Sequence, residues 1–288
     1  MKDLSRRLVV SLISIAIVFC LIFFAFNNWF QYVVAAVVSL LTAVAIWEYE
    51  QFAKAKGGRL ILPVLITYSV LEVLSFFLAA QFPSLPLESL PLVVFFLGFV
   101  TLFALHFNEK DGAVVDLSVS SFGLLYIAVP VGMILGILFL NGGQDGRWWI
   151  GYLLVVTKIT DVGAYFAGNL WGRRKLAPRI SPGKTVEGAL FGLLCAVLAS
   201  YGFHYLSLYS GASGFSLGTA EWIFLGLFLG IIGQFGDLSE SLLKRDANKK
   251  DSNALPGLGG VLDSIDSLLF NAPVLYIYLH FLKKFVTT

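Results

Sequence analysis

The sequence predicts an all-α protein that crosses a membrane about nine times, and three observations lead to this fold class. Of its 288 residues, 58% are hydrophobic and only 13% are charged, whereas about a quarter of the residues are charged in a typical soluble domain. Nine stretches are apolar over roughly the 20 residues that a spanning helix needs. Basic residues are concentrated in alternate connecting segments, as they are in polytopic membrane proteins.

The predicted spans cover residues 8–26, 30–47, 60–80, 91–107, 117–140, 148–171, 186–208, 219–236 and 261–282. We divide them into an N-terminal region, residues 1–116 with about four spans, and a C-terminal region, residues 117–288 with about five. The C-terminal region contains the two longest polar loops, residues 172–185 and 237–260. We expect both loops to be cytoplasmic.

The distribution of charge predicts the orientation. If the N-terminus is cytoplasmic, 16 of the 20 Lys and Arg residues lie in inside segments and three in outside segments, in agreement with the positive-inside rule. The basic N-terminus precedes an apolar core that is too long for a signal peptide and has no small-residue cleavage site after it, so we expect a retained helix. A net charge of +2 gives no support for a nucleic-acid partner.

The first five predicted spans contain few groups that could take part in chemistry. Glu72 is the exception, because it lies in the middle of the third span. Two interpretations remain open for it: a carboxyl group hydrogen-bonded between helices, or a proton or substrate site. Small residues in several spans permit a homodimer without requiring one.

The sixth span carries two charges three residues apart, Lys158 and Asp161, which therefore lie on one face of a helix. They either form an ion pair that only holds helices together or line a polar cavity. Because buried charges are costly in a membrane, the cavity is the favoured interpretation. Gly163, Gly168 and Gly172 follow, and they allow close helix packing or an opening.

A strongly basic loop comes next. Ser181-Pro-Gly marks a turn in it, and Thr185 is placed to cap the following helix. Cations beside a helix N-terminus are suited to binding phosphate. The alternative is ordinary positive-inside bias together with attraction to lipid headgroups. The candidate cations are Arg173, Arg174, Lys175, Arg179 and Lys184.

The most polar stretch runs from Asp237 to Asp266. Asp263 and Asp266 are one helical turn apart, and Asp237 reaches the same depth if the intervening loop folds back. Three carboxylates at the membrane interface suit Mg²⁺, which takes few protein ligands and leaves room for phosphate oxygens. Helix capping explains each acid singly, but not all three beside two basic clusters. The pattern therefore favours a metal site.

Between these acids, Ser239–Asp251 is expected to form a short cytoplasmic amphipathic helix whose leucines face the bilayer. Glycines follow just before the last span, where a tight turn would let backbone N–H groups approach phosphate oxygens. These glycines are Gly257, Gly259 and Gly260.

Two segments resemble the phosphatidate cytidylyltransferase family, also called CDP-diacylglycerol synthases. One is Thr160–Ala189, TDVGAYFAGNLWGRRKLAPRISPGKTVEGA; the other combines SLLKR, KDS, PGLGG and LDSID between Ser241 and Asp266. Together they cover roughly the C-terminal half. The chain departs from the family pattern at Leu258, where the family usually has His, and at Ser264, where it usually has Arg.

The resemblance implies transfer of a cytidylyl group from CTP to phosphatidate by an integral enzyme of a bacterial-type inner membrane, with its active site facing the cytoplasm and Mg²⁺ as cofactor. It implies catalytic roles for Asp237, Lys244, Asp263 and Asp266, the three aspartates being the metal ligands. Substrate contacts are then expected from Asp161, Arg173, Lys175, Arg179, Ser181, Lys184, Ser241, Arg245, Lys250, Asp251, Gly259 and Gly260. We also expect a cavity near the cytoplasmic interface, formed by spans six to nine and open sideways to lipid.

Two rival functions remain. A CTP-dependent enzyme acting on a polyprenol-type lipid would need a general base to activate the alcohol. An ion-coupled transporter could use Lys158, Asp161 and Glu72 as an ion pathway, but it leaves the acidic and basic cytoplasmic clusters unexplained.

Overall fold

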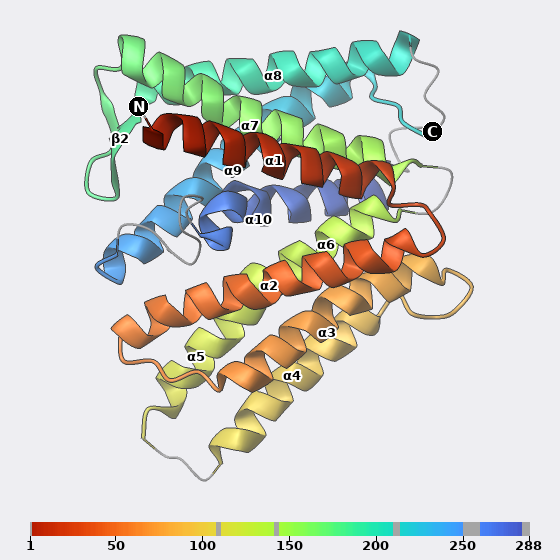
Figure 1. Ribbon diagram of the computed structural model, residues 1–288, viewed down its shortest axis with the longest axis vertical. Helices are drawn as coiled ribbons and strands as arrows, with labels where there is room; N and C mark the ends of the chain where they lie inside the picture. Colours follow the sequence, from red (N-terminus) through yellow and green to blue (C-terminus); the bar gives the residue numbers. More distant parts are fainter. Residues whose placement is uncertain (1, 108–110, 141–143, 210–213, 250–259, 284–288) are drawn as a thin grey trace. The chain divides into compact units, whose positions relative to one another are not determined.

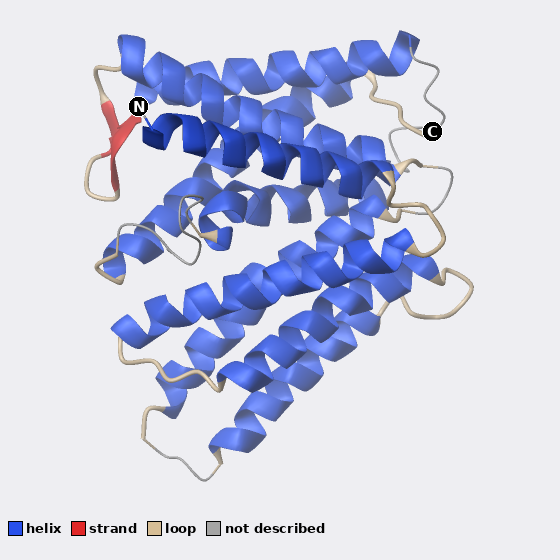
Figure 2. Cartoon of the chain, in the orientation of Figure 1, coloured by secondary structure: helices blue, strands red, loops and turns tan. Residues whose placement is uncertain are grey.

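The computed structural model describes residues 2–107, 111–140, 144–209, 214–249 and 260–283, with side chains from residue 13 onward. These residues are helical except for turns, connecting segments and one two-stranded hairpin (Figure 2). Seven helices in the described part are long and apolar enough to cross a membrane, and two further apolar helices, Ile13–Phe23 and Leu90–His106, are shorter. The all-α polytopic membrane fold is therefore confirmed. The exact number of nine spans stays a prediction.

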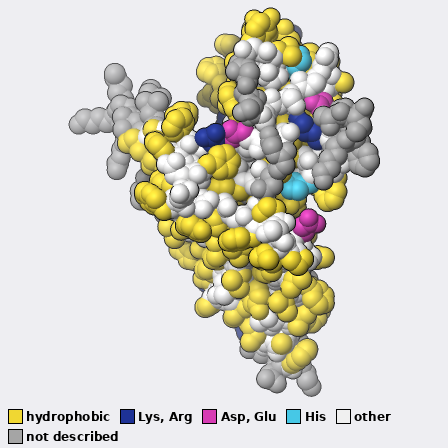
Figure 3. Space-filling model, turned by 90° about the vertical axis from the view of Figure 1, so that its right-hand side faces the viewer, with side chains coloured by type: hydrophobic (Ala, Val, Ile, Leu, Met, Phe, Trp, Pro, Cys, Tyr) yellow, Lys and Arg dark blue, Asp and Glu magenta, His cyan; other side chains and the backbone are white. Residues whose placement is uncertain are grey.

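The surface of the protein is suited to lipid. Hydrophobic side chains predominate on the face drawn in Figure 3, with only scattered charged groups between them. Large apolar side chains such as Leu92 and Phe96 are 71% and 61% exposed. Exposure of this kind on many helices would be unfavourable in water, and it identifies the surroundings of these helices as a bilayer.

The chain folds into two compact units, each made of two segments. The first comprises residues 1–139 and 247–265, and the second residues 140–246 and 266–288. This division differs from the expected one at residue 116, because the helical stretch 113–138 packs with the N-terminal helices. The expectation that the chemistry lies in the C-terminal region concerns function and stays a prediction.

The first unit contains α1 (Lys2–Phe23), α2 (Phe30–Ala55), α3 (Leu62–Gln81), α4 (Leu90–His106), α5 (Ala113–Gly123), the π-helix η1 (Leu124–Ala128) and α6 (Val129–Leu138) (Figure 1). Hydrogen bonds between side chains and neighbouring helices help to fix how these helices pack. Gln81 Nε2 donates to Gln31 Oε1 (2.7 Å) between α3 and α2, and Tyr49 OH donates to the carbonyl of Val119 (3.0 Å) between α2 and α5.

Glu72 lies in α3 and is only 2% exposed. One of its carboxylate oxygens, Oε2, has no hydrogen-bond partner among the described residues. A carboxyl group buried in this way is expensive in a membrane span. Both interpretations of Glu72 therefore stay open.

The second unit contains α7 (Gly146–Trp171), β1 (Lys175–Ala177), β2 (Ser181–Thr185), α8 (Val186–Tyr209), α9 (Thr219–Asp246), most of α10 (Val261–Ile277) and the π-helix η2 (Tyr278–Leu282). The two strands pair antiparallel, with Lys175 opposite Thr185 and Ala177 opposite Ser181. The hairpin lies at the ends of α7 and α8 (Figure 1). The predicted loop 172–185 is thus an ordered β-hairpin for most of its length.

Glycines bring the helices of the second unit into close contact. A Cβ on Gly188 of α8 would lie 2.6 Å from the carbonyl oxygen of Ala164 in α7, and a Cβ on Gly163 would lie 2.6 Å from Cys195 Sγ. Only glycine permits backbones to approach this closely. The predicted close packing by Gly163 is confirmed, and it is the reason that α7 and α8 cross so tightly at the level of the candidate site.

The prediction of a separate amphipathic helix over Ser239–Asp251 is wrong. α9 continues without a break from the membrane span to Asp246. One face of this extension is buried, because Glu240 is fully buried while Leu242 is 51% exposed. Glycine and polar residues at the end of the apolar run suggested an interruption, but the helix continues through them with Glu240 fully buried. Residues 250–259 lie outside the described part of the chain.

Candidate active site

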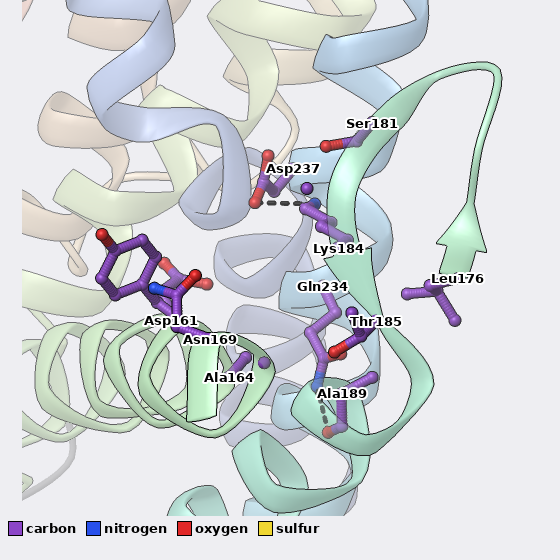
Figure 4. A pocket seen from close by; sticks show the side chains of 13 residues that line it. Asp161, Ala164, Asn169, Leu176, Ser181, Lys184, Thr185, Ala189, Gln234 and Asp237 are labelled. Atoms are coloured by element: carbon purple, nitrogen blue, oxygen red, sulfur yellow. Dashed lines mark hydrogen bonds and ion pairs between the residues drawn. The ribbon is translucent and has the colours of Figure 1, made fainter. Parts of the chain in front are cut away.

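A cavity of about 390 Å³ lies between α7, the β-hairpin, α8 and α9 (Figure 4). α7 contributes Asp161, Tyr165 and Asn169 to its wall, together with small residues. The remaining polar and charged lining residues are Ser181, Lys184, Thr185, Gln234 and Asp237. A pocket of this size with a few converging polar groups is the usual form of a small-molecule site.

Asp237 and Lys184 form an ion pair inside this cavity. Lys184 Nζ lies 2.7 Å from Asp237 Oδ2, and the two side chains are 25% and 32% exposed. Figure 4 shows them pointing toward one another from β2 and α9. Asp237 lies within α9, so the alternative that it caps a helix is excluded. The structure thus joins one residue from each of the two polar stretches identified in the sequence.

The hairpin that carries Lys184 is held at its base. Glu187, in the first turn of α8, accepts hydrogen bonds from the backbone N–H groups of Arg173 (3.0 Å) and Arg174 (3.1 Å). Thr185 Oγ1 accepts from the N–H of Gly188 (3.1 Å), which confirms the predicted helix cap. The position of the hairpin is therefore set by the start of α8.

The hairpin is also held near its tip. Arg245 Nε donates to the carbonyl oxygen of Ile180 (3.1 Å), so the guanidinium joins the C-terminal end of α9 to the hairpin. Lys244, one residue earlier, forms an ion pair with the fully buried Glu240 one turn back on α9. In this state both predicted phosphate-binding cations contact protein groups. Their roles toward a substrate stay predictions.

A second acid of α7 lies near this ion pair. Asp161 accepts a hydrogen bond from the Ser267 side chain and interacts electrostatically with Lys158, Asp237 and Lys184. Its place in the cavity wall supports the polar-cavity interpretation for Asp161. Lys158, in contrast, is exposed and does not line the cavity, so its part in that interpretation stays a prediction.

The start of α10 carries the other two predicted metal ligands. Asp266 is only 7% exposed; its Oδ1 accepts from the N–H of Ser267 (2.6 Å), and its charge interacts with those of Asp237 and Asp161. Asp263 accepts from the N–H of Gly260 (3.0 Å) and so caps its own helix. Asp266 and Asp237 are close because α9 packs on α10 through glycine: a Cβ on Gly236 would lie 2.8 Å from the Asp266 carbonyl oxygen.

The acidic side chains at and near the cavity form a small donor set for Mg²⁺. Among the described residues, no group of three or more His, Cys, Asp or Glu side chains is arranged to hold a metal ion. Mg²⁺, however, usually binds proteins through one or two carboxylates and takes its remaining ligands from water and substrate phosphates. Asp237 and Asp266 belong to the same unit, where α9 packs on α10 at Gly236, next to Asp237, and they could supply these two carboxylates. The chemistry of the donor set therefore fits a magnesium ion bound together with a nucleotide.

Of the predicted catalytic and substrate-binding residues, four line the cavity: Asp161, Ser181, Lys184 and Asp237. Those described but absent from its wall are Arg173, Lys175, Arg179, Ser241, Lys244, Arg245, Gly260, Asp263 and Asp266. Lys250, Asp251 and Gly259 lie outside the described part of the chain. The roles of all these residues stay predictions.

The sequence analysis did not single out Gln234, Asn169 or Tyr165, which also line the cavity. Gln234 Nε2 donates a hydrogen bond to the carbonyl of Ala189 (3.1 Å), so the amide of this α9 residue points toward α8 (Figure 4). An amide inside an apolar span is costly unless it is satisfied. That cost was an available signal, and attention to charged residues alone missed it.

Comparison with known proteins agrees with this geometry. Residues 5–282 match the cytidylyltransferase family. The chain is 34% identical to a phosphatidate cytidylyltransferase from Chlamydia pneumoniae over 289 residues, covering 96% of this chain and 92% of the relative. It is 33% identical to a phosphatidate cytidylyltransferase from Synechocystis over 307 residues, covering 95% and 96%.

A third relative matches only part of the chain. A phosphatidate cytidylyltransferase from Bacillus subtilis is 44% identical over 140 residues, which is 48% of this chain and 50% of that protein. The first two relatives and the family match, in contrast, extend through both compact units. The chain therefore belongs to the cytidylyltransferase family.

Proposed function

We propose that this membrane protein transfers the cytidylyl group of CTP to phosphatidate, giving CDP-diacylglycerol and pyrophosphate. Membership of the cytidylyltransferase family and the names of the relatives support the reaction. The observation that supports the assignment to this site is the Lys184–Asp237 ion pair, which brings a cation suited to phosphate and a carboxylate suited to a metal ion into one cavity.

The reaction needs positioning more than proton transfer. A phosphate oxygen of phosphatidate forms a bond to the α-phosphorus of CTP while the bond from that phosphorus to the bridging oxygen of pyrophosphate breaks. The nucleophile is already an anion, so no strong general base is required. The main barrier is repulsion between two anionic reactants, and fixed positive groups lower it.

The hairpin supplies such groups. Lys184 faces the cavity from β2, beside the Ser181 hydroxyl and the backbone at Gly183. The partial positive charge of the α8 N-terminus adds to this field. We assign this surface to the triphosphate of CTP, with Gln234 and Asn169 as further polar contacts.

We assign Asp237 and Asp266, both in the second unit, as carboxylates that would hold Mg²⁺; a ligand role for Asp263 stays a prediction. When bound, the ion would neutralise phosphate charge and polarise the α-phosphate toward attack. The ion pair of Asp237 is partly accessible, and such pairs contribute only about 0.2–1 kcal/mol. Lys184 can therefore leave Asp237 for a phosphate at small cost when the metal and nucleotide arrive.

We assign the cavity to the cytoplasmic side, where CTP is found, because the sequence segments 173–184 and 244–250 carry the largest groups of basic residues, five and four. The lipid substrate would enter from the bilayer. Apolar side chains of α7 near the cavity, such as Tyr165 and Phe166, are 68% and 59% exposed, which supports entry beside this helix.

The reaction is tested with detergent-purified protein given CTP, phosphatidate and Mg²⁺. We expect pyrophosphate release that depends on phosphatidate and stops when a chelator removes Mg²⁺. A polyprenol-type alcohol in place of phosphatidate should give no release. Release with the alcohol but not with phosphatidate would contradict the proposal, as would release that is unaffected by the chelator.

Replacing Lys184 with Gln should raise KM for CTP about tenfold or more and lower kcat/KM further, because one cation is lost from the triphosphate surface. Lys54→Gln is the matched control, since Lys54 also forms an ion pair, with Glu50 (2.9 Å), but belongs to α2. Steady-state kinetics with varied CTP measure both. Equal kinetics for the two variants would remove Lys184 from the site.

A further inference from the structure

The N-terminal region contains a fully buried carboxylate that contacts the helix of the predicted metal ligands. Glu48 lies in α2, and its side chain has no exposed surface. Its Oε1 accepts from the N–H of Val261 (2.9 Å) and its Oε2 from the N–H of Leu262 (2.7 Å). All three residues belong to the first compact unit.

These two N–H groups belong to the first two residues of α10. The first N–H groups of a helix have no partner within the helix and carry its partial positive charge. A carboxylate that accepts hydrogen bonds from both N–H groups fixes the distance and the direction of the helix start relative to α2. α10 then carries Asp263 within its first turn and Asp266 in the next.

A second contact joins α2 to the same segment. Lys249 Nζ lies 5.9 Å from the centre of the Phe52 ring, one turn along α2 from Glu48. Two residues of the segment 247–265, Lys249 and Val261, therefore contact α2. Tyr49 lies between Glu48 and Phe52 in α2, and its OH donates a hydrogen bond to the carbonyl of Val119 in α5. This part of α2 is therefore itself held in place.

We propose that Glu48 is a positioning residue of the transferase: by binding the first two N–H groups of α10, it sets the place of Asp263 and Asp266 for magnesium-dependent catalysis. The inference rests on the proposed site. It gives the N-terminal helices a part in the reaction, although they contribute no residue to the cavity wall. Glu48 itself is not expected to touch a substrate.

Glu48→Gln tests the inference with little change of volume. The amide keeps one acceptor oxygen, so either Val261 or Leu262 loses its hydrogen bond, and the negative charge at the helix start is lost. Glu50→Gln is the control. Glu50 lies on the same helix, is 4% exposed, and pairs with Lys54.

Two measurements are needed. Hydrogen–deuterium exchange of metal-free protein should be faster over residues 261–266 in Glu48→Gln than in wild type or Glu50→Gln. In Glu48→Gln, the Mg²⁺ concentration that gives half the maximal rate should rise about tenfold and kcat should fall, whereas KM for phosphatidate should not change. Unchanged exchange, or faster exchange with a wild-type magnesium response and kcat, would overturn the inference.

Val261→Pro is a second variant that tests the same inference if Glu48→Gln does not yield folded protein. Proline is favoured at the first helical position and removes one of the N–H groups that Glu48 binds, while Glu48 remains. It should shift the magnesium response in the same direction. If Asp266→Asn keeps the wild-type dependence of rate on Mg²⁺ concentration, the proposed site is overturned and this inference with it. If only Glu48→Gln and Val261→Pro keep the wild-type dependence, the role of Glu48 alone is overturned.

Discussion

Exchanging Asp237 for Asn is expected to lower kcat by about 10³-fold or more while the protein still folds. The amide keeps the size of the side chain but cannot hold a divalent cation with the same charge. Loss of one preorganised charge contact at a reacting phosphate costs on the order of 10²–10³ in rate, and loss of a metal ligand also weakens metal binding.

Folding should be affected much less. The Lys184–Asp237 pair is partly exposed, and ion pairs of this type contribute about 0.2–1 kcal/mol to stability. A thousandfold loss of rate corresponds to about 4 kcal/mol of transition-state stabilisation. The two effects are therefore separable by size, provided that yield and thermal unfolding in detergent are measured beside pyrophosphate release.

Asp246→Asn is the matched control, because Asp246 is exposed at the end of the same helix. It should keep nearly full activity. Comparable activity in Asp237→Asn and Asp246→Asn would remove Asp237 from the site. The same assay applied to α10 separates its two acids: Asp266→Asn should resemble Asp237→Asn, whereas full activity of Asp263→Asn would exclude Asp263 as a metal ligand and leave it a role in capping the helix through Gly260.

Exchanging Gly188 for Ala is expected to lower both stability and activity. The new Cβ would lie 2.6 Å from the carbonyl oxygen of Ala164 and 3.0 Å from the Cα of Gly168, both backbone atoms of α7. No side chain can rotate to relieve this contact, so α7 and α8 must move apart. Overpacking of this kind costs about 1–3 kcal/mol, more than the roughly 0.5–1 kcal/mol that Ala gains over Gly in a helix.

Gly202→Ala is the control on the same helix, because a Cβ at Gly202 meets no atom within 4 Å. It should raise the midpoint of thermal unfolding slightly, whereas Gly188→Ala should lower it by several degrees. Activity should also fall in Gly188→Ala, since the movement of α7 against α8 displaces Asp161 from Lys184. Equal midpoints for the two variants would contradict the close contact.

The sequence alone was sufficient to predict the membrane class, because apolar composition and helix length are local properties. The helix cap at Thr185 and the close packing at Gly163 were also predicted, since each depends on a few neighbouring residues. The extent of α9 was not. Whether a helix continues through a polar stretch depends on what its buried face packs against, and Glu240 on this extension is fully buried.

The candidate site shows the same limit. Asp237 and Lys184 were each identified as chemically suitable, but their pairing at 2.7 Å joins α9 to a hairpin 53 residues earlier in the chain. The cost of an amide in a span marked Gln234 and Asn169 as unusual, but it did not indicate which way either side chain points. The role inferred for Glu48 had no local signal at all.

The sequence by itself determined that this chain is a helical membrane protein whose acids and cations suit two anionic substrates, and its motifs indicated the family. The tertiary structure alone decided which of these groups meet. Side-chain chemistry and helix formation are set over a few residues. The meeting of Lys184 with Asp237, or of Glu48 with the start of α10, is set by packing between helices far apart in the chain, where close contact at glycines determines which faces come together.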